Sequence, residues 1–457
     1  MKIAVVGAGV AGLGAAWLLS KQHEVVLYEK NSRLGGHSNT VTARAYGRDI
    51  PVDTGFIVYN EVNYPNLTAL FEHLGVRTEA SDMSFAVSLF DGGFEFGSGN
   101  FSVFGQPTNL LDRRFHRMLA DLMRFNRLGK RLNRDATLAN LTLGDWLERQ
   151  HFSSWFVDRF ILPLSACIWS SSLDDMRQFP LLRFAEFFAD HRLFNIWRQQ
   201  NWRTVSNGSR SYVEKLARPI LGAARLGHSA VAVERHLDHV RLRDASGNWD
   251  RFDQVVLACH ADEALAALGG DASEAERETL AAFRYAPNRT ILHTDRALMP
   301  QRRAVWSSWN YVAPKPSRHG PIAVTYWMNR LQNIDNACPL FVTNNPVRET
   351  AQEAVLAEFA YSHPLYDHSA FAAQPRLAQL QGQRRTWFCG SYFGFGFHEA
   401  ALASGLAVAE ALGGQRPWNQ PAGEVAPKRP LADTLPGLAG GGALPGRGPV
   451  RGRADDA

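Results

Sequence analysis

The hydrophobic pattern at the start of the chain predicts a strand, a tight turn, a helix and a second strand. Residues 2–6 (Lys-Ile-Ala-Val-Val) are rich in β-branched side chains, as expected for a buried strand. A glycine-rich turn follows over 7–14, a helix continues through 15–20, and 24–29 (Glu-Val-Val-Leu-Tyr-Glu) forms the next strand pattern. Such a unit of about 30 residues is typical of a β-α-β crossover. The apolar run near the N-terminus therefore predicts a buried crossover unit rather than a signal peptide or membrane anchor.

The remaining pattern alternates between helical and strand-like stretches. Residues 61–200 are rich in Leu, Phe and Arg with few turn clusters, which predicts mostly helices. Residues 230–242 alternate like a hairpin, and 254–258 (Gln-Val-Val-Leu-Ala) predict a buried strand. Aromatic-rich strand patterns recur over 283–345, and a short strand, a glycine-rich turn and a helix follow over 386–412. We therefore expect an α/β fold.

Composition changes this picture only at the end of the chain. Residues 415–457 hold seven Pro and eight Gly in 43 positions, above the proportion of about 25–30% that favours disorder. We predict that the fold ends near Gly414 and that 415–457 form a disordered tail. The four cysteines are far apart and form no Cys-x-x-Cys pair, so we expect no metal site and a reducing, cytoplasmic compartment.

The net charge of +5 is partly concentrated in one segment. Between Arg113 and Arg134 there are eight basic residues and one acid, Asp121, with Leu, Met and Phe interleaved. This pattern predicts a basic amphipathic helix. Two interpretations stay open: a core-facing helix with a solvated face, or a contact with the inner face of a membrane over residues 113–134. No nucleic-acid-binding motif accompanies the charge, so we expect no nucleic-acid partner.

The first turn carries a dinucleotide-binding motif. Gly7, Gly9 and Gly12 have the spacing Gly-x-Gly-x-x-Gly after a strand and before a helix, and Glu29 ends the next strand. In this motif the glycines permit a tight turn, a close approach of the backbone to a pyrophosphate, and close packing of helix on strand. The N–H groups of Val10 and Ala11 then face the phosphates, and Glu29 accepts hydrogen bonds from the ribose.

The next segment separates FAD from NAD. Arg33, Gly35, Gly36, His37 and Ser38 follow the ribose acid, and at Gly55-Phe56 we expect a second close approach of the backbone, facing the ring system. The run from Gly7 to Thr40 resembles the flavin-containing amine oxidase and phytoene desaturase superfamily. This superfamily usually has Gly-Gly-Arg where the present chain has Gly-Gly-His, so Arg33 is the expected phosphate ligand. The resemblance implies FAD, with Lys30 and Val231 also beside the cofactor.

A second flavin motif lies near the C-terminus. Gly390, Ser391 and the run Gly396-Phe397-His398-Glu399-Ala400 precede a helix that contains Gly405. They resemble the superfamily's Gly-aromatic-x-Glu-Gly-Ala segment, whose helix points at the flavin N1–C2=O edge. Amine oxidases usually have a tyrosine of an aromatic cage at the Phe397 position, which makes an amine substrate less favoured here. We expect non-covalent attachment, because Cys389 is a strand residue with no mark of a flavin link.

The resemblance covers residues 1–413 and implies a Rossmann-type FAD-binding domain interleaved with an α+β substrate domain. Segments such as Trp202–Val205 and Trp306–Tyr311 resemble a bacterial branch described as predicted NAD/FAD-binding or amine-oxidase-like proteins. The branch is often associated with enzymes that modify acyl chains. We expect the FAD-binding domain to comprise 1–60, 201–262 and 381–414, and the substrate domain 61–200 and 263–380.

These expectations define a functional hypothesis with alternatives. Only one dinucleotide motif is present, which favours oxidation of a substrate by hydride transfer to flavin. The missing cage tyrosine, the aromatic runs and the basic segment 113–134 favour an oxidoreductase that oxidises or desaturates an apolar, lipid-like or acyl-chain substrate. The alternatives are a redox-neutral double-bond isomerase, an amine oxidase, or a non-catalytic flavoprotein partner of a lipid-modifying enzyme. The candidate catalytic residues are His398, as an acid or base, with Tyr392 and Asn310. The substrate, electron acceptor and oligomeric state stay open.

Overall fold

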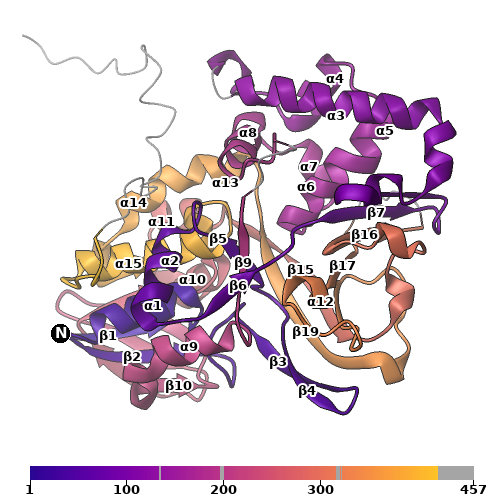
Figure 1. The fold of residues 1–457 in the computed structure, drawn as a ribbon. Helices are drawn as coiled ribbons and strands as arrows, with labels where there is room; N and C mark the ends of the chain where they lie inside the picture. Colours follow the sequence, from indigo (N-terminus) through magenta and orange to yellow (C-terminus); the bar gives the residue numbers. More distant parts are fainter. Residues whose placement is uncertain (133–134, 196–199, 315–319, 321, 420–457) are drawn as a thin grey trace, which may run out of the picture. The chain divides into compact units, whose positions relative to one another are not determined.

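The structure is a computed structural model that describes residues 1–132, 135–195, 200–314, 320 and 322–419 (Figure 1). Residues Met1–Ala422 form one compact unit with a mixed α/β fold. One part of this unit is a five-stranded parallel sheet that contains the N-terminal strand and has the order β10-β2-β1-β14-β20. Its strands are β1 (Lys2–Val6), β2 (Glu24–Glu29), β10 (Ala224–Leu226), β14 (Gln254–Leu257) and β20 (Thr386–Phe388).

The five strands come from three distant parts of the sequence, and each falls within the ranges expected for the FAD-binding domain. The division into two domains stays a prediction, because the described chain forms a single compact unit. The predicted crossover is confirmed: β1, α1 (Val10–Leu19) and β2 follow one another, and β1 and β2 pair in parallel from Lys2–Glu24 to Val6–Tyr28.

Helix α1 packs against two helices from later in the chain, α9 (Arg210–Ala217) and α15 (His398–Ala411). Glycines make the contact of α1 with α15 close. A Cβ atom added at Gly405 would lie 2.2 Å from the backbone oxygen of Ala11, so only glycine fits there. This contact brings the start of α15 beside the turn that follows β1.

A second, seven-stranded sheet has the order β19-β15-β18-β17-β16-β7-β8. All neighbouring pairs are antiparallel except β16 and β7. Its strands are β7 (Phe85–Leu89), β8 (Phe94–Gly97), β15 (Arg284–His293), β16 (Trp309–Ala313), β17 (Val324–Trp327), β18 (Phe341–Asn344) and β19 (Val355–Leu365). The expectation of mostly helices over 61–200 is met by the helices of this range, but it missed the strands β7 and β8. Both are buried strands that pair with each other, and β7 also pairs with β16, more than 200 residues later. No local pattern reveals the pairing of β7 with β16.

Helices cover this sheet on the side where α3 lies in Figure 1. They are α3 (Arg113–Leu132), α4 (Leu143–Arg149), α5 (Ser154–Phe156), a π-helical turn (Val157–Ile161), α6 (Leu162–Trp169), α7 (Leu173–Arg177) and α8 (Leu181–Asp190). Their buried aromatic side chains form much of the larger hydrophobic core; Phe125, for example, contacts Phe156, Phe184 and Phe188. The predicted basic helix is α3, and it buries Phe115, Met118 and Phe125.

Three small sheets complete the strand inventory of the described residues. They are β3 (Thr40–Ala45) with β4 (Arg48–Asp53); β5 (Val58–Asn60) and β6 (Thr78–Ala80) on either side of β9 (Trp202–Val205); and β11 (Ala230–Arg235), β12 (Val240–Asp244) and β13 (Trp249–Phe252). The remaining α-helices are α2 (Pro65–Leu74), α10 (Ala261–Leu268), α11 (Glu274–Leu280), α12 (Met328–Leu331), α13 (His368–Ala373) and α14 (Leu377–Leu380).

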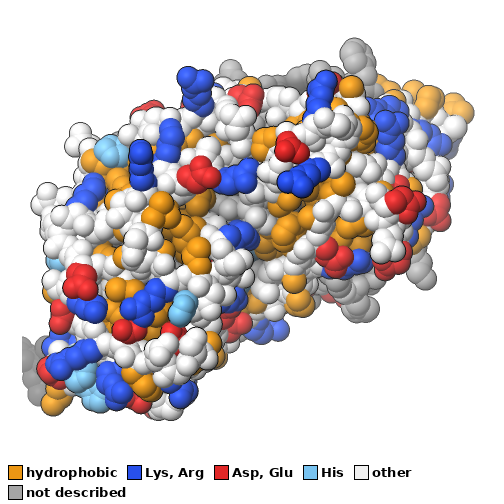
Figure 2. All heavy atoms as spheres, turned by 90° about the horizontal axis from the view of Figure 1, so that it is seen from below, with side chains coloured by type: hydrophobic (Ala, Val, Ile, Leu, Met, Phe, Trp, Pro, Cys, Tyr) orange, Lys and Arg blue, Asp and Glu red, His pale blue; other side chains and the backbone are white. Residues whose placement is uncertain are grey.

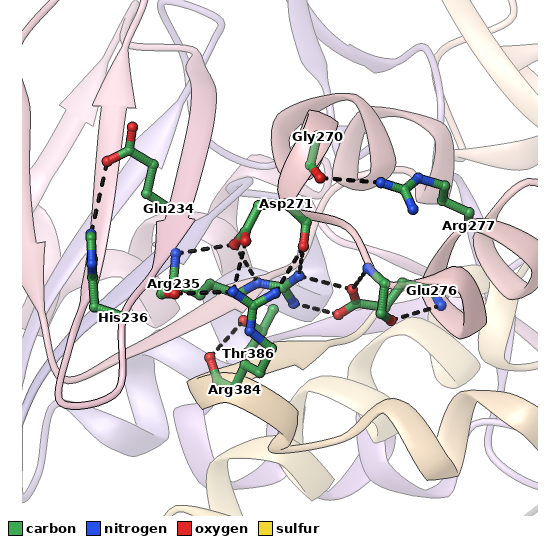
Figure 3. A network of polar contacts seen from close by, with 10 residues as sticks. Glu234, Arg235, His236, Gly270, Asp271, Glu276, Arg277, Arg384 and Thr386 are labelled. Carbon is green, nitrogen blue, oxygen red and sulfur yellow. Dashed lines mark hydrogen bonds and ion pairs between the residues drawn. The ribbon is translucent and has the colours of Figure 1, made fainter.

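A buried ionic network ties β11 to the α10–α11 connection and to the approach to β20 (Figure 3). Arg235 donates from Nε to the Asp271 carboxylate at 2.9 Å and from Nη2 to the Glu276 carboxylate at 2.9 Å. Arg384 donates to the other oxygen of Asp271 at 2.6 Å. The side chain of Arg235 is fully buried, so its charge is balanced by these carboxylates rather than by water.

The fold continues a few residues beyond the boundary predicted at Gly414. The ring of Trp418 stacks on Trp17 of α1 at 6.0 Å, and Arg416 pairs with Glu410 and donates to Asn66. Trp418 thereby covers part of an apolar helix, and proline and glycine content alone could not reveal this contact. The rest of the predicted tail, 420–457, lies outside the described residues.

Candidate active site

A cavity of about 1120 Å³ lies at the carboxyl ends of β1 and β2 and extends to the seven-stranded sheet and the helices that cover it. One end is lined by the turn after β1, the end of β2 and the loops around Gly36 and Gly55. The other end is lined by α6, α8 and the strands β16 and β17. Seventeen predicted site residues line it: Gly7, Gly9, Val10, Ala11, Glu29, Lys30, Arg33, Gly36, His37, Gly55, Phe56, Val231, Gly390, Ser391, Tyr392, Phe397 and His398.

The glycines of the first turn have different surroundings. A Cβ added at Gly12 would lie 1.9 Å from the backbone oxygen of Gly7, so Gly12 is required for packing. At Gly9 a Cβ would meet no described atom within 4 Å, and Gly9 lines the cavity. No side chain caps α1, whose first N–H groups therefore point to the same space. This is a cradle that a side chain at Gly9 would fill, as a pyrophosphate site at a helix N-terminus requires.

Glu29 organises the turn as well as lining the cavity. One carboxylate oxygen accepts from the backbone N–H of Ala8 at 2.8 Å, and the other accepts from the backbone and side chain of Asn31 at 2.9 and 2.7 Å. The neighbouring Lys30 forms an ion pair with Glu263 of α10. Glu29 is thus held in a fixed position at the end of β2, where a ribose hydroxyl is expected to bind.

The second glycine loop packs directly on the first. A Cβ at Gly36 would lie 3.0 Å from the Cα of Gly9, and one at Gly55 would lie 2.2 Å from the backbone oxygen of His37. Gly55 therefore has to be a glycine because of the 35–38 loop, and it also lines the cavity. Arg33 lines the same end of the cavity and makes a long hydrogen bond, 3.4 Å, to the backbone oxygen of Leu34.

Three histidines form a neutral group on the cavity wall. The ring of His37 lies 5.4 Å from that of His363 on β19 and 6.3 Å from that of His260. Burial lowers the pKa of His37 well below its usual value, with a further contribution from the neighbouring histidines, and lowers that of His363 to about 4. The Gly-Gly-His sequence thus gives a neutral side chain where the resembled superfamily has an arginine.

The N-terminus of α15 forms another part of the wall. Phe397 precedes the helix and stacks on Phe187 of α8 at 5.2 Å, while Gly390 donates its N–H to the hydroxyl of Ser404 at 2.9 Å. Glu399 turns away from the cavity and accepts from the backbone N–H groups of Asn66 and Leu67, at the start of α2. The glutamate of this motif therefore caps another helix.

His398 is the first residue of α15 and is held from two sides. Its ring stacks on Phe56 at 3.8 Å with an interplanar angle of 12°. Its Nε2 lies 2.9 Å from the hydroxyl of Ser38 and 2.8 Å from that of Tyr212. Burial lowers the pKa of His398 to about 3, so the ring is neutral at physiological pH, and the expected acid–base role near neutrality does not fit this site.

The described residues that line the other end of the cavity have neutral side chains. Aromatic and aliphatic residues predominate, with His191 and a few amides; burial lowers the pKa of His191 to about 4. The apolar and aromatic members are Ile57, Val58, Tyr64, Met83, Phe85, Leu164, Ile168, Trp169, Phe187, Leu193, Trp202, Trp309, Tyr326, Phe395 and Phe397. The charged lining residues are Glu29, Lys30, Arg33, Glu263 and Glu358, none of which belongs to α6, α8, β16 or β17.

The family model for flavin-containing amine oxidoreductases matches residues 10–305. The chain belongs to this family. It is therefore an FAD-dependent oxidoreductase, and the predicted cofactor and fold class are confirmed. A stretch of 51 residues is 47% identical to 4,4'-diapophytoene desaturase of Staphylococcus aureus, but this covers 11% of the chain and 10% of that enzyme. The chain thus matches only a small part of the desaturase.

Solved structures share the fold at low sequence identity. Putrescine oxidase bound to putrescine has a TM-score of 0.66 at 13% identity, over 90% of this chain and 99% of that one. A CLA-producing fatty acid isomerase from P. acnes has a TM-score of 0.62 at 14% identity, over 90% and 98%. Cyclohexylamine oxidase from Brevibacterium oxydans IH-35A has a TM-score of 0.63 at 15% identity, over 90% and 99%. Members with amine and fatty acid substrates are thus equally similar in fold.

Some predicted site residues do not line the cavity. They are Gly12, Gly35, Ser38 and Ala400; the hydroxyl of Ser38 nevertheless forms a hydrogen bond with His398, which does line it. Asn310 is fully buried in β16. Its amide donates to the backbone oxygens of Ser307 and Thr325 and accepts from the N–H of Ser307, so we assign it a structural role. Tyr392 lines the cavity, but its hydroxyl is buried without a hydrogen-bond partner among the described residues, which disfavours a catalytic role.

Sequence patterns missed the residues that approach from the substrate side. Phe187 of α8 and His191, the residue that follows α8, both line the cavity, and their rings stack at 3.9 Å. Helical periodicity indicates that positions 187 and 191 share a face, but not what the face contacts. Tyr212 was also missed, although its hydroxyl reaches both Ser38 and His398.

Two absences apply to the part of the chain that the structure describes. No group of three or more His, Cys, Asp or Glu side chains is arranged to hold a metal ion. Within the same residues, none of the helices combines the length and the hydropathy that crossing a bilayer requires.

Proposed function

We propose that this FAD-dependent oxidoreductase oxidises or desaturates an apolar substrate with an acyl or similar hydrocarbon chain. The uncharged lining of the cavity beyond Phe397 carries this proposal. A hydrocarbon chain gains free energy against such a wall, at about 25 cal/mol per Å² buried. An ammonium group would lose hydration there without a carboxylate to replace it.

When bound, FAD would supply the oxidising chemistry, the removal of a hydride from a substrate C–H bond. The net reaction takes two hydrogens from adjacent carbons of the substrate, which leaves a carbon–carbon double bond, and transfers them to an acceptor such as oxygen or a quinone. In this scheme Phe397, Phe187 and Trp169 orient the chain and exclude water, and the first turn of α1 holds the cofactor phosphates.

The test is anaerobic mixing of the FAD-loaded enzyme with lipids and with amines. We expect fatty acids or phospholipids of one class to bleach the flavin absorbance and leave a product two mass units lighter, while putrescine and cyclohexylamine do not. Bleaching by an amine with peroxide release in air, and none by any lipid class, would overturn the proposal in favour of an amine oxidase.

A matched pair of variants locates the lipid site. Ile168 faces the cavity from α6, whereas Val62 is 61% exposed on the surface. Ile168→Asn removes apolar contact worth roughly 1.5 kcal/mol, so KM for the lipid should rise about tenfold with unchanged FAD content. Val62→Asn should leave both unchanged.

A redox-neutral isomerase is the second candidate, since a fatty acid isomerase shares the fold. It predicts a product of unchanged mass, formed without oxygen uptake or added acceptor. Mass spectrometry of the anaerobic reaction separates the two, because the oxidation yields a lighter product with stoichiometric loss of flavin colour.

Apolar substrates of this class partition into bilayers, and the surface of α3 supports the proposal of a membrane contact. Its exposed basic residues are Arg113, Arg114, Arg117, Arg127, Lys130 and Arg131, whereas its one acid, Asp121, is buried and accepts from the N–H of Ser153. Leu111, just before the helix, is 89% exposed. On the face drawn in Figure 2, by contrast, basic and acidic side chains are interspersed. A basic, partly apolar helix surface suits anionic lipid.

Vesicle co-sedimentation tests this contact. Replacing Arg113, Arg127, Lys130 and Arg131 by Gln should reduce binding to phosphatidylglycerol-containing vesicles at least tenfold, at about 1 kcal/mol per charge. The control replaces four basic residues elsewhere, Arg44, Arg48, Arg243 and Arg251, for the same change in net charge. Equal loss in both variants would reduce the effect to net charge and refute a contact through α3.

A further inference from the structure

The side chains of Ser38, Tyr212 and His398 form a closed triangle of hydrogen-bonding atoms. The hydroxyls of Ser38 and Tyr212 lie 2.5 Å apart, and each is within 2.9 Å of Nε2 of His398. The three residues come from the loop after Gly36, from α9 and from the start of α15. Ser38 and Tyr212 are buried, so their hydroxyls depend on this triangle for hydrogen bonds.

Counting hydrogens decides how the triangle is arranged. If Nε2 of His398 accepts, one hydroxyl donates to Nε2 and the other donates to the first hydroxyl, so both hydroxyl hydrogens are used. If Nε2 carries a hydrogen, it cannot accept, and one of the two hydroxyl hydrogens is left without an acceptor among the described residues. A buried hydroxyl without an acceptor is costly, so the first arrangement is favoured.

The consequence appears on the opposite side of the ring. A neutral imidazole carries one hydrogen, so an accepting Nε2 requires a hydrogen on Nδ1. His398 lines the cavity beside Phe56 and Phe397, and its ring plane is fixed by the stacking on Phe56. We propose that Ser38 and Tyr212 hold His398 in the Nδ1–H tautomer, so that it serves as a hydrogen-bond donor to the flavin ring and not as a base.

This donor adds to the effect of the helix. The free N–H groups and the dipole at the start of α15 favour negative charge near the same point. A neutral N–H donor stabilises the negatively charged, reduced cofactor more than the oxidised one, and it therefore raises the reduction potential. The assignment goes beyond the proposed function and does not depend on the substrate.

The tautomer can be measured without turnover. In protein labelled with ¹⁵N-histidine, the resonances of His398 are identified by their absence in His398→Gln. We expect Nε2 to show the shift of an unprotonated nitrogen and Nδ1 that of a protonated one. In Tyr212→Phe combined with Ser38→Ala, both donors are lost and the preference should disappear. A protonated Nε2 in the unaltered protein would overturn the proposal.

The effect on the cofactor is tested by a pair of amide substitutions. The amide of Asn occupies nearly the position of Nδ1, and that of Gln nearly the position of Nε2. At a fixed reference-dye potential, the ratio of oxidised to reduced flavin should rise about tenfold in His398→Gln and much less in His398→Asn. Equal ratios in both variants, or no change in either, would refute the donor role. FAD content and unfolding temperature show whether each variant is folded.

Discussion

Gly9 and Gly12 lie one helical turn apart, yet they are glycines for different reasons. A Cβ at Gly12 would collide with the backbone oxygen of Gly7 at 1.9 Å, whereas a Cβ at Gly9 would enter open space. We predict that Gly12→Ala destabilises the apoprotein by at least about 2 kcal/mol, and that Gly9→Ala costs it less than about 1 kcal/mol. Gly9→Ala should nevertheless weaken FAD binding at least tenfold, because the methyl group occupies the pyrophosphate site.

Urea unfolding of the apoprotein and flavin fluorescence titration measure the two effects separately. Each variant is the control for the other, since both add one methyl group to the same turn. If Gly9→Ala bound FAD normally, the pyrophosphate would have to lie elsewhere in the cavity.

The motif residues are those that a sequence can predict, because a fixed spacing on one strand and one helix places them. Glu29 and Gly12 are examples. The contact of Tyr212 with His398 joins residues 186 apart, and no local pattern encodes it. Phe397 was placed correctly on the wall, but its partner Phe187 comes from a helix whose buried face could not be assigned. The contacts that the sequence could not predict are therefore mainly those between residues on the substrate side and residues on the cofactor side of the cavity.

At the scale of elements, the Arg235 network joins β11, α11 and the approach to β20 (Figure 3). We predict that Arg235→Leu lowers the free energy of unfolding by about 3–5 kcal/mol, because Glu276 is left buried without its cation. Arg241→Leu is the control: its pair with Glu234 is exposed, and its loss should cost less than about 1 kcal/mol. Denaturant unfolding of the apoprotein measures both.

The double variant Arg235→Leu/Glu276→Gln separates the loss of the cation from the loss of packing. Removing the unpaired negative charge of Glu276 should restore part of the free energy of unfolding. If it restored none, packing around the Leu side chain would account for the whole effect.

Elements with a local signal were predicted well. The β-α-β unit and the hairpin of β11 and β12 follow from alternation and turn residues nearby in sequence. Strands β7 and β8 were missed; β8 pairs only with β7, and the pairing of β7 with β16 bridges more than 200 residues and has no local signal. The helical expectation over 61–200 held for α2 to α8, and in α3 and α8 the buried apolar side chains recur at helical spacing.

Across the whole molecule, several histidines are buried in the neutral state. Burial lowers the pKa of His191, His293 and His363 to about 4 and that of His398 to about 3. In the unfolded chain these residues titrate near 6.5. The unfolded state therefore binds more protons between pH 6.5 and 4, and each such histidine reduces stability as the pH falls through this range. Asp53 opposes the trend, since burial raises its pKa to about 6.

We therefore predict that the apoprotein loses stability on acidification from pH 6.5 to 5, by roughly 1.5 kcal/mol for each fully buried neutral histidine. Urea unfolding at a series of pH values measures the slope. His293 provides the internal test, because it is fully buried away from the cavity, where its ring bonds to Thr343 and to the N–H of Asp295. Gln at this position cannot titrate, so His293→Gln should flatten the slope by one histidine's share, whatever its effect on stability at pH 7. An unchanged slope would mean that His293 is already protonated in the native state or stays uncharged in the unfolded chain, and either result would contradict the assignment of neutral buried histidines.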